Sequence, residues 1–409
     1  MPLSNVALGR RLQAARENCG LTQEAAAEAI GVSRTVVAHM EGGDRTVTTR
    51  ELTEFAALYR RPVASFLAEA DSEAGELFVL LYRQAAQLEG DEGARRAVLH
   101  YLDLCGEGIV LEELLGRASR AKLPSYAMEP PRSALQAIRQ GEEVAREERA
   151  RLGLGCAPIP SVGDLAASQG LWISWVGLPD SVSGLFFNHP SIGMGILVNE
   201  CHQGARKRFS LAHEYGHALV DREHRVTATT TSNSADWSEK RANSFASTFL
   251  LPEAGIHELL ASMDKGAPSR EEVTVYDVAR DTGQPVSQRN VAQSQRLSYR
   301  EVVVVARHFG ASYEATVFRL LNLKLVSKAA AELLQQQGPL ASRYARVLEL
   351  REPTEDPRRI ESQVLQIALE AYSQVEISRG RLLEILQKLM VPPGEITEIL
   401  AEAEAGRSG

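Results

Sequence analysis

Apolar residues recur along most of this chain at the spacing of a helix that buries one face. Leu8 and Leu12 lie one helical turn apart, and Leu52, Phe55 and Tyr59 repeat that spacing further along. Residues three or four positions apart share a face of an α-helix, so such a stripe predicts a helix that packs on its neighbours. We therefore expect most of the chain to be helical.

The first 69 residues predict five short helices separated by tight turns. Thr22 and Ser33 are of the type that caps a helix N-terminus, and glycines follow both predicted helices. The expected helices are one ending at Cys19-Gly20, then 23–30, 34–41, one beginning near Thr48 or Thr49, and one over 62–67. Together they predict a small N-terminal helical domain.

Further along, short apolar runs predict strands between longer helices. The expected strands are 171–176, 182–187 and 196–199, and the expected helices are 134–152, 205–220 and 237–250. We expect a loop over the Thr-, Ser- and Asn-rich stretch 223–236 and no definite element over the polar stretch 264–298. Residues 300–400 return to a helical pattern, interrupted by prolines.

These elements predict a mainly α, multidomain protein with an N-terminal five-helix domain, an α+β core with a small sheet and a helical C-terminal region. The expected divisions are residues 1–69, a helical connector over 70–125, a core over 126–330 and a C-terminal region over 331–409. Three prolines within 124–132 suggest a linker before the core.

Composition and charge restrict the partners and the compartment that we expect for the protein. The formal net charge is −8, so any nucleic-acid binding must come from a local surface. The four cysteines stand far apart, without a CxxC pair, and indicate reduced thiols. Residues 1–11 lack an apolar signal core and no apolar run reaches spanning length. We expect a soluble, cytoplasmic protein that has no membrane partner.

The strongest chemical signal is a His-Glu-x-x-His motif, formed by His213, Glu214 and His217. On a helix, residues four apart lie on one face, so the two imidazoles can bind one Zn²⁺. Glu214 points to the flank, where it can act on a water molecule as a general base. The apolar residues around the motif predict a buried helix.

A catalytic zinc takes three protein ligands, so a third must come from elsewhere. Glu239 is favoured because it lies near the buried stripe of the next helix, one turn before Asn243. Asp236, His224 and His202 are rivals on spacing alone. A developing oxyanion also needs a hydrogen-bond donor besides the metal. Tyr215, His224 and His308 are candidates for this donor.

Residues 138 to about 252 resemble the ImmA/IrrE family of zinc metallopeptidases. The resemblance rests on Glu142–Leu152, on Ser183-Gly184 through Val198-Asn199, on Arg208–His217 and on Glu239–Pro252. It implies a zincin-like fold, His213, His217 and Glu239 as zinc ligands, and Glu214 as the catalytic base. Tyr215 stands where the family more often has Leu. Weaker likeness continues through 308–321 and 375–382.

The N-terminal segment resembles the Cro/repressor-like helix-turn-helix domain. The resemblance is carried by Leu21–Glu24, Gly31–Val36 and Glu41–Gly43. In that fold the third helix reads the major groove. The expected DNA-binding residues are Gln23, Ser33, Arg34, Thr35, His39 and Arg45, with Arg50 as a further phosphate contact. Residues 1–69 contain eight Arg, no Lys and eight acidic residues, so a protein-pairing role stays open.

Together the two resemblances imply a zinc endopeptidase and transcriptional regulator that cleaves a repressor-like protein to release stress or mobile-element genes. We expect an extended substrate to add to the sheet edge near 182–187. One alternative is a DNA-binding transcription factor whose peptidase-like domain is only a sensor or scaffold. Another is an antitoxin-like partner binder. A homodimer through the C-terminal helices stays open.

Overall fold

The structure is a computed structural model of the 409-residue chain. It describes residues 4–18, 21–59, 63–67, 92–117, 123–189, 192–202, 204–223, 226–230, 236–267, 270–278, 280–289, 291, 294–350, 355, 359–377 and 379–407. Within these ranges the fold is mainly helical, with an N-terminal helix-turn-helix region, a small mixed sheet and a helical C-terminal region. The predicted fold class is therefore confirmed.

The N-terminal region consists of five helices whose ends follow the predicted caps. They are α1 (Asn5–Asn18), α2 (Gln23–Ile30), α3 (Arg34–Gly42), α4 (Thr49–Leu58) and α5 (Ala64–Leu67). The Thr22 and Ser33 side chains accept from backbone N–H groups of α2 and α3, and Gly31 and Gly43 end those helices in the left-handed conformation. A buried ion pair of Arg16 with Glu41 ties α1 to α3 at 2.6 Å.

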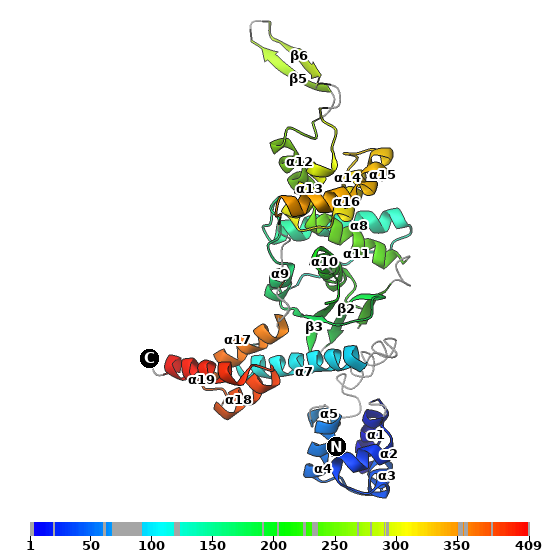
Figure 1. Ribbon diagram of the computed structural model, residues 1–409, viewed down its shortest axis with the longest axis vertical. Coiled ribbons are helices and arrows are strands. Elements are labelled where there is room, and N and C mark those ends of the chain that lie inside the picture. The colour runs from blue at the N-terminus through cyan, green and yellow to red at the C-terminus, as the bar shows by residue number, and fades with distance from the viewer. Residues whose placement is uncertain are drawn as a thin grey trace.

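A four-stranded mixed sheet forms the centre of the molecule (Figure 1). Its strands are β1 (Trp172–Val176), β2 (Val182–His189), β3 (Gly193–Asn199) and β4 (Val226–Thr230), in the order β1-β3-β2-β4. β1 runs parallel to β3, whereas β2 is antiparallel to both of its neighbours.

Two predictions fail at β4. The stretch 223–236 is not loop throughout, because residues 226–230 form a strand. β2 is not the free edge expected for a substrate, because β4 pairs with it from Val182 to Phe187. The physical reason is the run of Val and Thr in this stretch, since β-branched residues fit a pleated strand well.

Both faces of the sheet carry helices. On one face lie α9 (Val162–Ser168) and α10 (Gly204–Val220), followed outward by α11 (Trp237–Leu250) and α8 (Ala134–Arg151). On the other face, α7 (Glu92–Leu114) packs together with α17 (Arg359–Ser373). Side chains alternate along the strands, so Phe186 packs with the first group and Phe187 with the second.

The remaining helices extend these two layers. α12 (Glu253–Ser262), α13 (Tyr299–Phe309), α14 (Tyr313–Asn322), α15 (Lys328–Gln336) and α16 (Gly338–Val347) continue the layer of α8 and α11, and α18 (Arg379–Lys388) and α19 (Pro393–Arg407) pack with α17. The polar stretch 264–298 contains a projecting hairpin, β5 (Arg270–Asp277) and β6 (Thr282–Arg289) (Figure 1). Across the described residues, no helix is long and apolar enough to cross a membrane.

Candidate metal centre

The candidate site is built on α10, which is buried on nearly all sides. Its residues from Ser210 to Leu219 are buried, between the sheet and α11. Gly216 allows this close packing, because a Cβ there would lie 2.9 Å from a ring atom of Phe245 on α11. At the other end of α10, fully buried Arg208 donates to the Ile159 carbonyl at 2.6 Å and pairs with Glu355. The helix is therefore held firmly at both ends.

His213, His217 and Glu239 converge in space. The two Nε2 atoms lie 3.1 Å apart, and Glu239 approaches them at 3.1 Å and 3.6 Å. Three ligands around a tetrahedral zinc, with bonds of about 2.0–2.2 Å, stand roughly 3.3 Å from one another. Nitrogen and carboxylate donors at this spacing fit Zn²⁺, and together they are the group able to hold a metal among the described residues.

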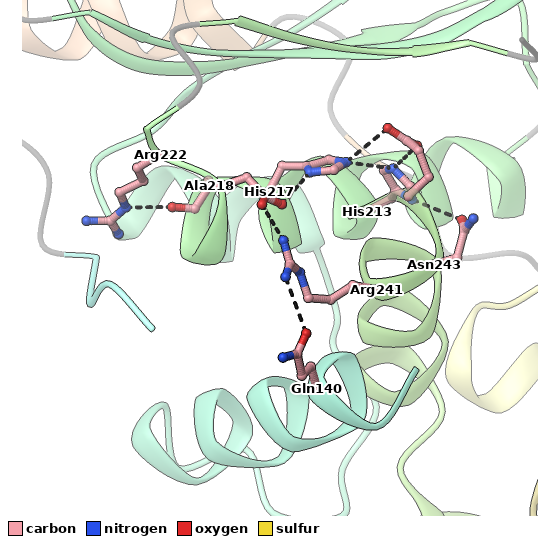
Figure 2. Close-up of polar contacts among 9 residues, drawn as sticks. Gln140, His213, His217, Ala218, Arg222, Arg241 and Asn243 are labelled. Carbon is pink, nitrogen blue, oxygen red and sulfur yellow. Dashed lines mark hydrogen bonds and ion pairs between the residues drawn. The ribbon is translucent and has the colours of Figure 1, made fainter. Parts of the chain in front are cut away.

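Hydrogen bonds to neighbouring side chains fix which ring nitrogen each histidine presents. His213 Nδ1 lies 3.0 Å from the Asn243 Oδ1 acceptor, and His217 Nδ1 lies 2.8 Å from Asp221 Oδ2 (Figure 2). Arg241 pairs with Asp221, and Gln140 of α8 accepts from Arg241 at 3.4 Å. With both Nδ1 atoms held by these acceptors, Nε2 of each ring faces Glu239 and is the nitrogen left for a metal.

Burial and hydrogen bonding together shift the pKa values of His217 and Glu239. Burial alone would lower the pKa of His217, but its hydrogen bonds to Asp221 and Glu239 outweigh burial and raise that pKa to about 10. For Glu239, burial acts to raise the pKa, while hydrogen bonds to His213 and His217 lower it to about 2. Glu239 is therefore a carboxylate at neutral pH, the form that binds a metal.

Glu214 lies beside the cluster, against the sheet. It is completely buried, and neither carboxylate oxygen makes a hydrogen bond of good geometry within the described part of the chain. Gly184 of β2 makes room for it, since a Cβ there would lie 2.6 Å from Glu214 Oε1. Burial raises the pKa of Glu214, and His213, His217 and Thr229 of β4 oppose that rise. Such a carboxylate is suited to accept a proton.

Residues 175–278 match the family model of the IrrE N-terminal-like domain, Peptidase_M78. This IrrE-like region contains β2 to β4, α10 and α11, and so includes every residue of the cluster. Residues 7–66 match the family model of a helix-turn-helix domain. The comparison with curated proteins found no match to the chain. Both resemblances drawn from the sequence are confirmed by these matches, and the chain combines a helix-turn-helix region with a peptidase-like one.

Where the structure describes them, the rival ligands and the suggested oxyanion donors do not join the cluster. Asp236 is exposed at the start of α11, and His202 is buried outside the cluster. Tyr215 turns away from the metal residues and its hydroxyl bonds Glu148 of α8. His308 is exposed near the end of α13 and contacts Phe309. His224 lies outside the described residues.

The residues suggested for DNA contact fall into two groups. Ser33 caps α3, and Arg34, Thr35 and His39 are exposed along it. Gln23 and Arg45 are instead engaged with carboxylates: Gln23 donates to Glu41 at 2.9 Å, and Arg45 to Glu51 at 2.8 Å. Arg50 is exposed and pairs with Glu54.

Sequence reasoning missed Asn243, Asp221 and Arg241 as supports of the histidines. A signal was present, because Asn243 follows Glu239 by four positions and Asp221 follows His217 by four. Residues one helical turn apart share a face, so a hydrogen-bond acceptor at that spacing is a candidate partner for a ligand pair.

Proposed function

We propose that this protein is a zinc-dependent endopeptidase and transcriptional regulator, which binds DNA through its N-terminal region and cleaves a repressor-like regulatory protein. The observation that carries the proposal is the convergence of His213, His217 and Glu239 with the buried base Glu214 in an IrrE-like region. The helix-turn-helix match in the same chain supports a regulatory role. Stress response or mobile-element control is the setting that we propose for it.

In this mechanism the two histidines and Glu239 hold the metal, and Asn243 and Asp221 keep the rings oriented. A bound Zn²⁺ supplies Lewis acidity that activates water and polarises the scissile carbonyl. Glu214 accepts the proton of the attacking water and passes it to the leaving amine. The burial of Glu214 favours this transfer. Burial raises the pKa of Glu214 and so makes its carboxylate a stronger base toward the water.

The test compares cells that contain the wild-type protein with cells that contain Glu214→Gln. Intact-mass proteomics should find a fragment of a regulatory protein only with wild type, while metal analysis of both purified proteins finds equal zinc, because Glu214 is not a ligand. Glu395→Gln, on α19, is the control and should retain cleavage. Equal cleavage by the Glu214→Gln protein would overturn the mechanism.

A second function is favoured by the burial of the site. His213, Glu214, His217 and Glu239 are each exposed by 2 % or less, so a substrate has no direct path to them. A transcription factor that uses the IrrE-like region only as a sensor or scaffold fits this burial. Full promoter regulation by the Glu214→Gln protein, without any cleaved partner, would support this second function.

A further inference from the structure

β4 occupies the outer edge of β2, beside the candidate metal centre. The two strands are antiparallel, and Thr229 stands opposite Gly184 in the ladder. The backbone of β2 passes close to the base at this point, since a Cβ on Gly184 would lie 2.6 Å from Glu214 Oε1. The ladder therefore places β4 next to the base as well as next to β2.

An extended peptide that is cleaved at this centre needs the same place. Its scissile carbonyl must come within about 3–3.5 Å of the attacking water that Glu214 activates. Peptides bind exposed sheet edges by adding a strand, because the edge offers a row of main-chain hydrogen-bonding groups. The edge of β2 that passes Glu214 is already paired, from Val182 to Phe187.

A cavity beside Asn243 does not provide another route. It has a volume of about 1070 Å³ and lies between α10, α11, α13, α14 and α16. Its lining includes Asn243, behind His213, but none of His213, Glu214, His217 or Glu239. A side chain could enter this cavity, whereas a scissile bond there would not meet the base.

We propose that β4 is an autoinhibitory strand, which fills the position of the substrate's extended segment and must separate from β2 before cleavage. This inference rests on the proposed endopeptidase function. Thr229 and its neighbours in β4 then control access to the centre and take no part in its chemistry.

The exchange of β4 for a substrate strand is governed by concentration. Both strands offer β2 the same main-chain hydrogen bonds, so the net gain in bonds is small. β4 is tethered, and a short tether gives an effective concentration of roughly 1 mM. A free peptide at about 1 μM is outcompeted by roughly a thousandfold. A substrate that is docked elsewhere on the protein escapes this disadvantage, which makes docking the determinant of specificity.

The first test opens β4 by a double substitution, Thr227→Pro with Ala228→Pro. Adjacent strand residues point their N–H groups in opposite directions, so one of the two prolines removes a hydrogen bond to β2. The readout is the rate at which the zinc-loaded full-length protein loses Zn²⁺ to EDTA. We expect an increase of about tenfold, the size of effect of one net hydrogen bond. Val275→Pro with Tyr276→Pro, on the exposed hairpin strand β5, is the matched control and should leave the rate unchanged.

The second test fixes β4 against β2 with a reducible disulfide. The same folded protein is then compared in its oxidised and reduced states. Val182 and Thr230 are Cα partners at the end of the β2–β4 ladder. Opposed residues of antiparallel strands lie at a spacing that a disulfide can bridge. The Val182→Cys/Thr230→Cys protein, once oxidised, should lose Zn²⁺ more slowly than wild type, and reduction should restore the wild-type rate.

The outcomes separate this inference from the proposed function. Equal zinc loss by wild type, the opened variant and the cross-linked variant would overturn the role of β4. Because zinc loss does not need hydrolysis, the measurement is repeated in the Glu214→Gln background, where the same differences are expected. Faster zinc loss by the opened variant, with no cleavage product in cells, supports β4 as the cover and overturns the endopeptidase assignment instead.

Discussion

Asn243 and Asp221 determine what His213 and His217 can offer to a metal. Each accepts a hydrogen bond from Nδ1 of its histidine, so Nε2 of each ring faces Glu239 and is the nitrogen left for a metal. Arg241 in turn pairs with Asp221. Partners of this kind commonly change metal affinity although they never touch the metal.

A substitution at Asn243 tests this support directly. Asn243→Ala removes the acceptor for His213 Nδ1, and we expect the affinity for Zn²⁺ to fall by about 10–100-fold. Asn243→Asp keeps an acceptor at the same place and should retain most of the affinity. Competition with a chromophoric zinc chelator measures both values. Identical affinities for the Ala and Asp variants would show that the contact does not support the ligand.

The raised pKa of His217 predicts a pH dependence of metal binding. Its pKa of about 10 means that His217 holds a second proton at pH 7.5, and a metal must displace it. Affinity should therefore rise with pH, by about tenfold per unit between pH 7 and 9. The same proton stabilises the metal-free fold fully below about pH 6.5, and that stabilisation is lost as the pH approaches 10.

Calorimetry measures this proton directly. Zinc titrations at pH 7.5 in two buffers of different ionisation enthalpy should show about one proton released per metal bound. Binding enthalpies that are the same in both buffers would contradict the protonated state of His217.

The relative positions of the candidate ligands could be predicted from the sequence, whereas the side chains that support them could not. A His-Glu-x-x-His motif on a helix fixes the relative positions of His213 and His217 by local geometry alone. Whether Asn243 turns toward His213 depends on how α11 packs on α10. That packing is set by tertiary contacts such as Gly216 against Phe245, which leave no local pattern.

At the scale of elements, α3 is the part of the N-terminal region best placed to meet DNA. Arg34, Thr35 and His39 are exposed along it. The Arg16–Glu41 pair anchors its opposite side, and Gln23 joins the same carboxylate from α2. If α3 reads DNA as the sequence predicts, its exposed side chains would need no rearrangement, whereas Gln23 would first have to exchange its carboxylate partner.

We predict that Arg34→Ala with His39→Ala weakens binding to DNA fragments that the wild-type protein selects from a random pool. Each lost base contact costs about 1–3 kcal/mol, so the affinity should fall at least tenfold. Fluorescence anisotropy at fixed salt measures the change. Gln13→Ala, exposed on α1, serves as the control and should bind as wild type does. Unchanged affinity of the double variant would favour a protein-pairing role for this region.

Element boundaries were predictable where side chains mark them. The bounds of α2 and α11 agree with the prediction, because Thr22 and Gly31 delimit the first, and Pro252 follows the second. The sequence predicts a loop at β4 because its Thr residues are polar and also common in turns. Its pairing with β2 is a long-range contact, and only the tertiary structure decides between the two states.

At the scale of the whole molecule, helices from before and after the IrrE-like region cover one face of the central sheet. α7 precedes the IrrE-like region, and α17 follows it by about 80 residues, yet the two pack together on one face of the sheet. Trp172, Leu185 and Leu197 of the sheet are buried in that shared core. No local sequence signal indicates that two helices so far apart in sequence meet.

A buried ion pair links the C-terminal half to α10, the helix that carries the candidate ligands His213 and His217. Glu355 pairs with Arg208 and also accepts from the backbone N–H groups of Val162 and Gly163 at 3.0 Å. Glu355→Ala leaves Arg208 buried without its partner, and we expect it to destabilise the fold by about 3–5 kcal/mol. Urea denaturation followed by fluorescence of the sheet residues Trp172 and Trp175 measures the loss.

A compensating variant separates the ion pair from general packing. Arg208→Met with Glu355→Met removes both charges, and it should recover much of the lost stability. Glu314→Ala, exposed on α14, is expected to change stability by less than about 0.5 kcal/mol. If the double variant is no more stable than Glu355→Ala, the unpaired charge is not the cause of the loss.

The pair also has a consequence for the time course of biosynthesis. Arg208 and Glu355 are separated by 147 positions. At about 5–20 residues per second, a ribosome needs roughly 7–30 s to reach the second after making the first. During that interval a nascent chain has α10 without the carboxylate that anchors it. Completion of the candidate metal centre is thereby delayed until most of the polypeptide has been translated.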